Sequence, residues 1–463
     1  MEHADVVVIG GSAAGLAAAM TARRHYPEKS VLVLRREKKV LIPCGIPYIF
    51  GTLGSPDKNL IPDSILEKNG IGLRVGEVTR IDRAGHVVET EHGPVRYERL
   101  VVATGSRPEK PPIPGLDLDG VFAIVKDIPF LERLQQHLAQ ARNVVVIGGG
   151  FIGIEFADEM KKAGANSVTV VECARHCLSL SYDAEFCQRM ESHLESRGVT
   201  VRTGRRVLEV LGDPKVRSVR LDDGSELPAD LVVVGIGAAA NVDLARVAGL
   251  ALGPTGGILV DRTMKTSDPQ VFAAGDCAEK TSFLGGQPSA LRLASIACSE
   301  GRVAGANLFV TRREQAGTVG AWCTAVGDLA LGTAGLTEDA AVRRGFDVAT
   351  ASVEGVTRHP GGMPGAGPQK VKMVFDRRTG RVLGGQVMGD AVTGEVTNVI
   401  AACIQGGMTA EDLAVFQIAT HPALTASPLV YALNNVAEQA LCGMAAARKA
   451  QQTQASPEGV LPA

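Results

Sequence analysis

The chain has 463 residues, of which 45% are hydrophobic and 21% charged, and its formal net charge is -2. This length exceeds what one ordinary hydrophobic core organises, so we expect a globular protein of two or three domains. A net charge so close to zero excludes the strongly basic balance of many nucleic-acid-binding or membrane-surface proteins. We expect neither a secretory leader nor a membrane span, because the sequence shows no apolar run of the roughly 20 residues that a span requires.

Nine cysteines are scattered along the chain, mostly in apolar or helical surroundings. An odd number without regular spacing argues against a disulfide scaffold and favours a reducing compartment. We therefore expect a cytoplasmic protein.

The first predicted element is an apolar strand that ends in a glycine-rich turn, at residues 4–15. Strand, turn and the Ala-rich helix that follows form the pattern in which backbone N–H groups approach the pyrophosphate of a dinucleotide. A serine, small enough for the site, replaces the middle glycine. The residues predicted to contact the nucleotide are Gly10, Ser12, Ala13, Ala14 and Gly15. Arg35 ends the next strand, where an acid usually binds the ribose, so Glu37 is the candidate ribose ligand.

A single cysteine, Cys44, stands in the following segment, and the next cysteine in the chain is Cys173. A redox thiol without a second cysteine must form its bond with an outside group, as a mixed disulfide, a persulfide or a sulfenic acid. The alternative is a buried structural cysteine. Residues 45–50, closed by Gly51, are predicted to form a short helix whose N-terminus lowers the pKa of the thiol.

Residues 143–153 repeat the first pattern with all three glycines present. The later strands also match, 167–171 with 30–34 and 228–235 with 97–105, so the sequence predicts two units that each bind a dinucleotide. The predicted contacts of the second unit are Gly148, Gly150, Phe151, Ile152, Gly153 and Gly237. Glu172 ends its second strand, where a carboxylate accepts from a ribose 2′-OH and repels a 2′-phosphate. NADH is therefore favoured, and NADPH stays open because Arg175 follows.

A third marker, residues 266–276, combines a buried strand, a turn of small residues and one acid, Asp276. Together with the two glycine-rich patterns and residues 103–108, it resembles the flavoprotein family of pyridine nucleotide-disulfide oxidoreductases over residues 4–445. The resemblance implies that FAD binds the first unit, with Asp276 on its ribityl chain. Further FAD contacts implied by it are Ala103, Thr104, Gly105 and Gly275.

The implied fold class is α/β, with two Rossmann-like dinucleotide-binding domains and a C-terminal α+β dimerisation domain. We expect an FAD-binding domain over residues 1–110 and 253–325 and an NAD-binding domain over 111–252. The dimerisation domain is expected over 326–446, with a disordered tail over 447–463. The resemblance implies a homodimer.

Residues 43–48 resemble the single-cysteine branch of this family, which includes coenzyme A-disulfide reductases, NADH oxidases and peroxidases, and polysulfide or persulfide reductases. That branch implies Cys44 as the redox centre beside the flavin. Glu155 matches a family glutamate near the nicotinamide and flavin rings, and the lysine that pairs with it in two-cysteine members has no counterpart after Cys44. The branch often carries a serine where this chain has Val40.

His421, followed by proline, resembles the acid–base histidine of the two-cysteine reductases, which a second subunit contributes. An imidazole suits that role because its pKa lies near neutrality. The alternative is a structural histidine at a turn. Thr420 stands where coenzyme A-disulfide reductases carry a tyrosine, and Ala426 replaces the glutamate that orients the histidine in two-cysteine members.

Two further sets of residues have competing interpretations. Arg23 and Arg24 could bind the phosphates of a coenzyme A substrate, or could only complement the helix dipole. Four residues suggest a metal site by composition but lack the paired spacing of zinc ligands, so no metal is expected. These are Cys173, His176, Cys177 and Cys187.

The predicted function is reduction of a small disulfide, polysulfide or persulfide by NAD(P)H, through FAD and Cys44. An NADH oxidase or peroxidase, which reduces oxygen or hydrogen peroxide, is the alternative within the enzymes. A redox-sensing flavoprotein with little turnover is the alternative outside them. The expected partners are a small sulfur or peroxide substrate, a coenzyme A derivative among the options, with neither nucleic acid nor membrane.

Overall fold

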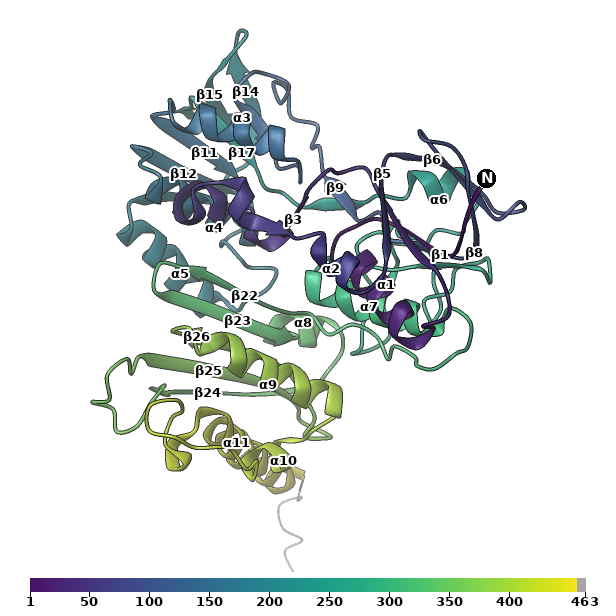
Figure 1. Cartoon of the computed structure of the whole chain (residues 1–463). Helices are drawn as coiled ribbons and strands as arrows, with labels where there is room; N and C mark the ends of the chain where they lie inside the picture. Colours follow the sequence, from purple (N-terminus) through teal and green to yellow (C-terminus); the bar gives the residue numbers. More distant parts are fainter. Residues whose placement is uncertain (456–463) are drawn as a thin grey trace, which may run out of the picture. The chain divides into compact units, whose positions relative to one another are not determined.

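The computed structural model describes residues 1–455. It divides into two compact units (Figure 1). The N-terminal unit comprises Met1–Cys177 and Leu194–Thr318, and the C-terminal unit comprises Leu178–His193 and the chain from Val319 onward. In the described part of the chain no helix is both long and apolar enough to cross a bilayer.

The first sheet of the N-terminal unit is built around parallel strands. They are β1 (Glu2–Ile9), β2 (Val31–Arg35), β5 (Gly72–Val75), β8 (Val95–Val102) and β19 (Val271–Ala273). Antiparallel strands β7 (Val87–Thr90) and β6 (Val78–Asp82) extend it, in the order β5-β2-β1-β8-β7-β6, and β19 also pairs with β8. Strand β19 therefore brings a distant segment beside the closing strand of the first glycine-rich unit.

Helices α1 (Ala13–His25) and α7 (Ala294–Asn307) lie against each other beside this sheet (Figure 1). Small residues permit the close approach: a Cβ added at Gly301 or Gly305 would overlap the carbonyl oxygen of Ala14 or Ala18. The buried side chains of the two core clusters are mainly Val, Ile, Leu and Ala, as expected for parallel strands covered on both faces.

The second sheet repeats the strand–helix–strand arrangement of the first. Its parallel strands run in the order β10 (Val121–Ala123), β17 (Leu231–Val234), β11 (Asn143–Ile147), β12 (Ser167–Glu172) and β13 (Val199–Thr203). Its helices are α3 (Ile128–Leu138) and α4 (Phe151–Lys162), and a smaller antiparallel sheet consists of β14 (Val207–Gly212), β15 (Val216–Leu221) and β16 (Glu226–Pro228). The predicted internal repeat is confirmed, because β11, α4 and β12 correspond to β1, α1 and β2.

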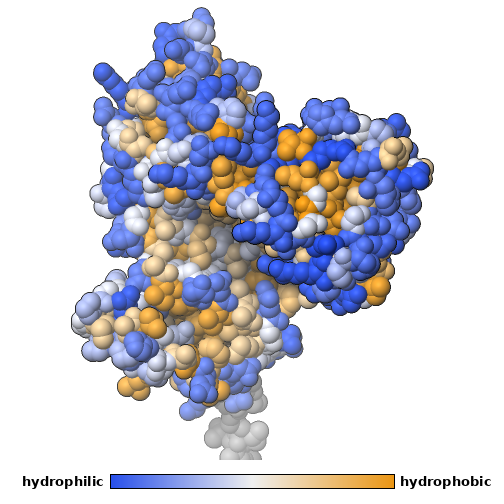
Figure 2. Space-filling model, in the orientation of Figure 1, coloured by the Kyte–Doolittle hydropathy of each residue, from blue (hydrophilic) through white to orange (hydrophobic). Residues whose placement is uncertain are grey.

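The C-terminal unit contains an antiparallel sheet with helices. The strand order is β22 (Ala321–Val326), β23 (Leu329–Gly335), β26 (Val382–Gly389), β25 (Pro368–Asp376) and β24 (Val348–Val356). The helices are α8 (Glu338–Arg343), α9 (Thr393–Gly406), α10 (Ala410–Ala414) and α11 (Ala432–Ala455). Apolar and polar side chains alternate in small patches over the face of this unit seen in Figure 2. The α/β fold with an appended α+β domain is confirmed.

Short elements complete the description: α2 (Ser64–Lys68), α5 (Ala184–Ser196), α6 (Asp243–Val247), η3 (Pro56–Asn59), η4 (Pro428–Val430), β9 (Ser106–Pro108), β18 (Ala238–Ala240), β20 (Lys280–Thr281) and β21 (Pro288–Ser289). The predicted start of the tail at residue 447 is wrong, because α11 continues to Ala455. The Ala, Gln and Lys residues there favour a helix more than their low complexity suggests. Residues 456–463, where the rest of the predicted tail falls, lie outside the described residues.

Candidate active site

Cys44 lies in a turn between two short strands, β3 (Val40–Leu41) and β4 (Leu60–Ile61), which pair antiparallel. The turn is 3₁₀-helical over η1 (Pro43–Gly45), where Pro43 presets the backbone, and π-helical over η2 (Ile49–Leu53). The predicted helix over residues 45–50, closed by Gly51, is therefore wrong: the segment forms a 3₁₀ turn and a π-helical turn, and the latter ends at Leu53. Gly54, with φ of 75°, supplies the left-handed residue that ends η2.

Gly51 is instead required by close contact with α4. A Cβ at this position would lie 2.5 Å from the carbonyl oxygen of Glu159. The buried carboxylate of Glu159 accepts the N–H of Thr52 at 2.7 Å and the Thr52 hydroxyl at 2.8 Å. Phe50 and Phe156 pack ring to ring at 5.3 Å. The helix that begins at the second glycine-rich turn thus holds the segment that carries Cys44.

The Cys44 thiol is exposed to solvent at the surface, yet it is crowded by neighbouring atoms. This desolvation raises the pKa of the thiol, Glu155 raises it further, and Lys126 acts in the opposite direction. The predicted lowering of the pKa by a helix N-terminus is therefore wrong. A 3₁₀ turn of three residues has too few aligned peptide groups to outweigh burial and a nearby carboxylate.

Tyr48, four residues after Cys44, shares this environment. Desolvation and Glu155 raise the pKa of its phenol well above the ordinary value, so the group keeps its proton at neutral pH. Sequence reasoning did not single out Tyr48. The spacing of four residues in a helical turn was the available signal.

Lys126, in the loop between β10 and α3, is a second residue that sequence reasoning missed. Its Nζ lies 3.9 Å from a carboxylate oxygen of Asp276, and that oxygen accepts the hydroxyl of Ser106 at 2.7 Å. Its charge also lowers the pKa of Cys44. Lys126 therefore supplies a cation near Cys44 and Asp276. It is distant from both in the sequence and belongs to no recognisable motif, so the sequence alone did not indicate it.

The first glycine-rich turn fits a dinucleotide pyrophosphate. Gly10 has φ of 116°, and a Cβ there would overlap the carbonyl oxygen of Ala103, while a Cβ at Gly15 would overlap that of Gly10. Ser12 precedes α1 without a capping hydrogen bond from its side chain. The turn is thus tight enough to expose backbone N–H groups at the helix N-terminus, where an anion binds. Ala13 and Ala14 form the first residues of α1 and add no bulk.

Arg35 takes a structural role at the end of β2. Its guanidinium binds both carboxylate oxygens of Asp63, at 2.6 and 2.8 Å, and donates to the carbonyl oxygens of Glu37 and Lys38. This shapes the loop in which Glu37 pairs with Arg36 at 3.0 Å. The ribose role of Glu37 stays a prediction.

The second glycine-rich turn has the same geometry. Gly148 has φ of 106°, a Cβ at Gly153 would overlap its carbonyl oxygen, and open space surrounds Gly150. Phe151 and Ile152 begin α4. Glu172 accepts the N–H of Gly149 at 2.6 Å and that of Ala174 at 2.7 Å. The Cys173 thiol also donates to Oε1 at 3.4 Å, so the carboxylate is held beside the turn and Oε2 retains a lone pair for a further donor.

The remaining predicted cofactor residues line the strand ends around these turns. Thr104 donates its hydroxyl to the carbonyl oxygen of Asn241 at 2.7 Å, and Gly105 and Gly237 both take left-handed φ, 70° and 119°. Gly275 follows β19 directly and precedes Asp276. Their contacts to a cofactor stay predictions.

His421 belongs to the C-terminal unit, whereas Cys44 belongs to the N-terminal unit. Its Nδ1 accepts the N–H of Ala423 at 3.2 Å, so Nε2 carries the hydrogen in the neutral ring. Thr425 closes the same turn by accepting the N–H of His421 at 3.1 Å. The catalytic role of His421 stays a prediction.

Arg23 donates to three backbone carbonyl oxygens, those of Pro27, Lys29 and Asn69. These contacts agree with a structural role at the end of α1, and Arg24 beside it is exposed. Substrate binding by either arginine stays a prediction. The described residues contain no group of His, Cys, Asp and Glu arranged to hold a metal ion.

Comparison with known proteins places this geometry in a family. Residues 4–301 match pyridine nucleotide-disulphide oxidoreductases, and residues 323–429 match the dimerisation domain of that family. The chain is 35% identical over 429 residues to the NAD(P)H coenzyme A polysulfide/persulfide reductase of Pyrococcus horikoshii, covering 90% of this chain and 94% of that protein. It is 29% identical over 436 residues to the NADH oxidase of Methanocaldococcus jannaschii, with coverage of 90% and 94%.

Among solved structures, a NAD-dependent persulfide reductase from A. fulgidus matches with a TM-score of 0.88 at 33% identity. The match covers 95% of this chain and 84% of that one. Family membership implies FAD and NAD(P)H as cofactors. The chain is therefore an oxidoreductase that belongs to the pyridine nucleotide-disulphide oxidoreductase family.

Proposed function

We propose that the protein reduces persulfides, polysulfides or small disulfides with NAD(P)H, using Cys44 as its redox centre. The observation that carries this proposal is the solvent-exposed thiol of Cys44, which forms no disulfide and is subject to the opposing charges of Glu155 and Lys126. A thiol without a resolving cysteine forms its bond with the substrate. The relatives named as polysulfide or persulfide reductases support the same substrate class.

The residues present fit the two cofactors that the family implies. The turn at Gly10 and the carboxylate of Asp276 would hold FAD, which when bound supplies a two-electron link between the nicotinamide and a sulfur atom. The turn at Gly148 would hold the nicotinamide dinucleotide. We propose NADH as the preferred form, because Glu172 is fixed where it would accept from a 2′-OH and repel a 2′-phosphate.

The chemistry at Cys44 follows from its thiolate. The thiolate attacks one sulfur of the substrate's S–S bond, and that bond breaks. Attack on a disulfide or on the inner sulfur of a persulfide leaves a mixed disulfide on Cys44 and expels a thiolate or hydrosulfide, whereas attack on the outer sulfur leaves a Cys44 persulfide and expels a thiolate. Two electrons from NAD(P)H and a proton then release the bound group as a thiol or H₂S and restore Cys44. Overall, NAD(P)H, one proton and a persulfide RSSH give NAD(P)⁺, RSH and H₂S.

Nearby groups control protons in this cycle. Lys126 favours the thiolate, whereas Glu155 favours the thiol. We propose that His421 of a second subunit protonates the leaving sulfur, and hence that the enzyme works as a homodimer. The odd number of cysteines, scattered along the chain, supports the proposal of a reducing, cytoplasmic location.

Replacing Cys44 with Ser tests the proposal. Under anaerobic conditions, Cys44→Ser should lower the rate of NADH oxidation by coenzyme A persulfide by about 10³-fold or more, as expected when a nucleophile is removed. Cys442→Ser, which also removes an exposed thiol, serves as the control and should keep the wild-type rate. Wild-type turnover by Cys44→Ser would refute the thiol mechanism.

NADH oxidase activity is the second candidate, and one observation favours it. Burial and Glu155 raise the pKa of Cys44, which weakens it as a nucleophile towards sulfur at neutral pH, and relatives named NADH oxidases match most of the chain. Oxygen consumption with NADH should then exceed turnover with coenzyme A persulfide under matched conditions. Oxygen consumption below about a tenth of persulfide turnover would exclude this candidate as the main activity.

A further inference from the structure

Two charged side chains are buried together behind the turn that follows β19. Lys280 begins β20 and Glu300 lies in α7, with side chains only 2% and 1% exposed, and Lys280 Nζ is 3.1 Å from Glu300 Oε2. Removing two charges from water costs free energy, and apolar residues of similar volume often stabilise a protein equally well. Stability alone therefore does not account for this ion pair.

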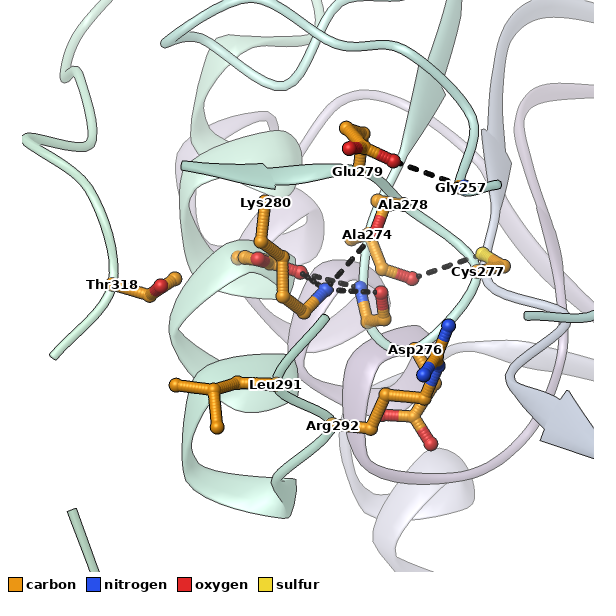
Figure 3. Close-up of polar contacts among 12 residues, drawn as sticks. Gly257, Ala274, Asp276, Cys277, Ala278, Glu279, Lys280, Leu291, Arg292 and Thr318 are labelled. Carbon is orange, nitrogen blue, oxygen red and sulfur yellow. Dashed lines mark hydrogen bonds and ion pairs between the residues drawn. The ribbon is translucent and has the colours of Figure 1, made fainter. Parts of the chain in front are cut away.

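The pair binds both polar backbone atoms of Gly275. Figure 3 shows Lys280 close to the turn that carries Asp276 and Ala278. Glu300 Oε2 accepts the N–H of Gly275 at 2.8 Å, and Lys280 Nζ donates to the carbonyl oxygen of Gly275 at 2.7 Å. Lys280 Nζ also donates to the carbonyl oxygen of Ala278 at 3.2 Å. Three acceptors match the three N–H bonds of a charged ammonium group.

The surroundings of Glu300 disfavour its charged form. Burial raises the pKa of its carboxyl, while Lys280 and the N–H of Gly275 oppose that rise. Its other oxygen, Oε1, is buried and has no hydrogen-bond partner among the described residues. Such an arrangement persists where the hydrogen bonds it makes fix a local conformation.

Gly275 occupies a position that tolerates little movement. Its φ is 83°, and an added Cβ would lie 2.7 Å from the Cβ of Ala14, in the first turn of α1. The next residue is Asp276, whose carboxylate accepts from Ser106. The orientation of the Gly275 peptide therefore sets where the side chain of Asp276 begins, directly beside the first glycine-rich turn.

We propose that Lys280 and Glu300 are positioning residues for FAD, which hold the Gly275 peptide so that Asp276 is preorganised to bind the cofactor. This inference rests on the proposed assignment of Asp276 to FAD. A preformed turn loses less conformational freedom when the cofactor binds, so its contribution appears as cofactor affinity.

The decisive variant is the double replacement Lys280→Met with Glu300→Gln. It removes both charges together and keeps similar side-chain volumes, so no buried charge is left unpaired, and the unfolding temperature of the apoprotein should fall no further than in the matched control pair. It also removes the hydrogen bond from Lys280 to the carbonyl oxygen of Gly275, which then keeps only the bond from the N–H of Ala278. The dissociation constant for FAD, measured by quenching of flavin fluorescence as apoprotein is titrated, should rise by about tenfold, the scale of one lost hydrogen bond.

The matched control is Arg83→Met with Asp268→Asn. This pair is 2.8 Å apart in the same unit, and Arg83 also donates to backbone carbonyl oxygens, those of Ala248 and Gly249, but neither residue touches Gly275. It should leave the FAD dissociation constant within about twofold of wild type, the scatter expected of a site without a direct role.

Each result bears on the proposal. An FAD dissociation constant within about twofold of wild type for the Lys280 and Glu300 double variant overturns it. Equal losses of FAD affinity and apoprotein stability in both double variants also overturn it, because the pair would then be only structural. Asp276→Asn separates this failure from that of the cofactor assignment: wild-type FAD affinity in that variant would refute the role of Asp276 itself.

Discussion

At the scale of single residues, two opposite charges act on one thiol. Glu155 on α4 raises the pKa of Cys44, and Lys126 before α3 lowers it. Glu155 was expected from the resemblance, whereas Lys126 was not, because residues far apart in sequence converge only once the sheets have formed. Lys126, whose Nζ lies 3.9 Å from a carboxylate oxygen of Asp276, is therefore a residue that only the fold reveals.

Replacing Glu155 with Gln removes a negative charge near the sulfur, so the thiolate forms more readily. The pH midpoint for alkylation of Cys44 by iodoacetamide should move to lower pH, because loss of that charge lowers the pKa of the thiol. Mass spectrometry of the Cys44 peptide after timed alkylation gives the profile. Glu109→Gln, at an exposed site, should leave the midpoint unchanged, and a shift to higher pH in Glu155→Gln would contradict the electrostatic account.

Replacing Lys126 with Met should shift the pKa of Cys44 in the opposite direction, upward. The positive charge that favours the thiolate is lost, so the alkylation midpoint should move to higher pH and the rate at neutral pH should fall. The same peptide assay measures it, with Lys110→Met, also exposed, as the control. A midpoint that stays in place would remove Lys126 from the site.

At the scale of elements, the sequence predicted the helices and strands whose pattern is local. It did not predict the segments whose conformation depends on contacts with distant residues. Both strand–turn–helix units were predicted from their apolar runs and glycine spacing, because these local patterns are typical of a buried parallel strand followed by a tight turn and a helix. The segment after Cys44 did not, because the contact of Gly51 with Glu159 sets its π-helical turn. The end of α11 was missed because a polar, Ala-rich composition is ambiguous between helix and tail.

Gly51 and Gly54, in the segment that follows Cys44, should differ in how much a larger residue destabilises the protein. A methyl group at Gly51 would press on α4, so Gly51→Ala should lower the free energy of unfolding by about 1–3 kcal/mol, the range for overpacking. Gly54 has left-handed φ but no atom within 4 Å of an added Cβ, so Gly54→Asn should cost less than about 1 kcal/mol. Urea unfolding followed by circular dichroism compares them. Equal losses would show that the contact with α4 does not decide the turn.

At the scale of the whole molecule, exposed apolar side chains gather in the segment from Val415 to Val430. Val415 is 80% exposed, Leu424 68% and Leu429 85%. This segment lies in or next to the residues that match the dimerisation domain. Such exposure is typical of a surface that a second copy covers.

Leu429→Asp should therefore weaken the dimer. A charge in an apolar interface lacks a partner, so the dimer dissociation constant should rise by about 100-fold or more. Sedimentation velocity at micromolar concentration would show a dimer for wild type and a monomer for the variant. Val247→Asp, which alters a similarly exposed apolar side chain on α6, 76% exposed and outside that segment, is the control. A wild-type monomer would refute the homodimer.

Because few of the cysteines are exposed, the covalent state of Cys44 during a single turnover can be followed by mass spectrometry. Of the nine cysteines, Cys44, Cys173, Cys323 and Cys442 are exposed, and the others are wholly or partly covered. A chain with serine at the last three of those four positions keeps Cys44 as its one readily labelled sulfur. Intact-protein mass would then count the atoms that each substrate leaves there: +32 Da for one sulfur, +16 Da for one oxygen, and a whole coenzyme for a mixed disulfide.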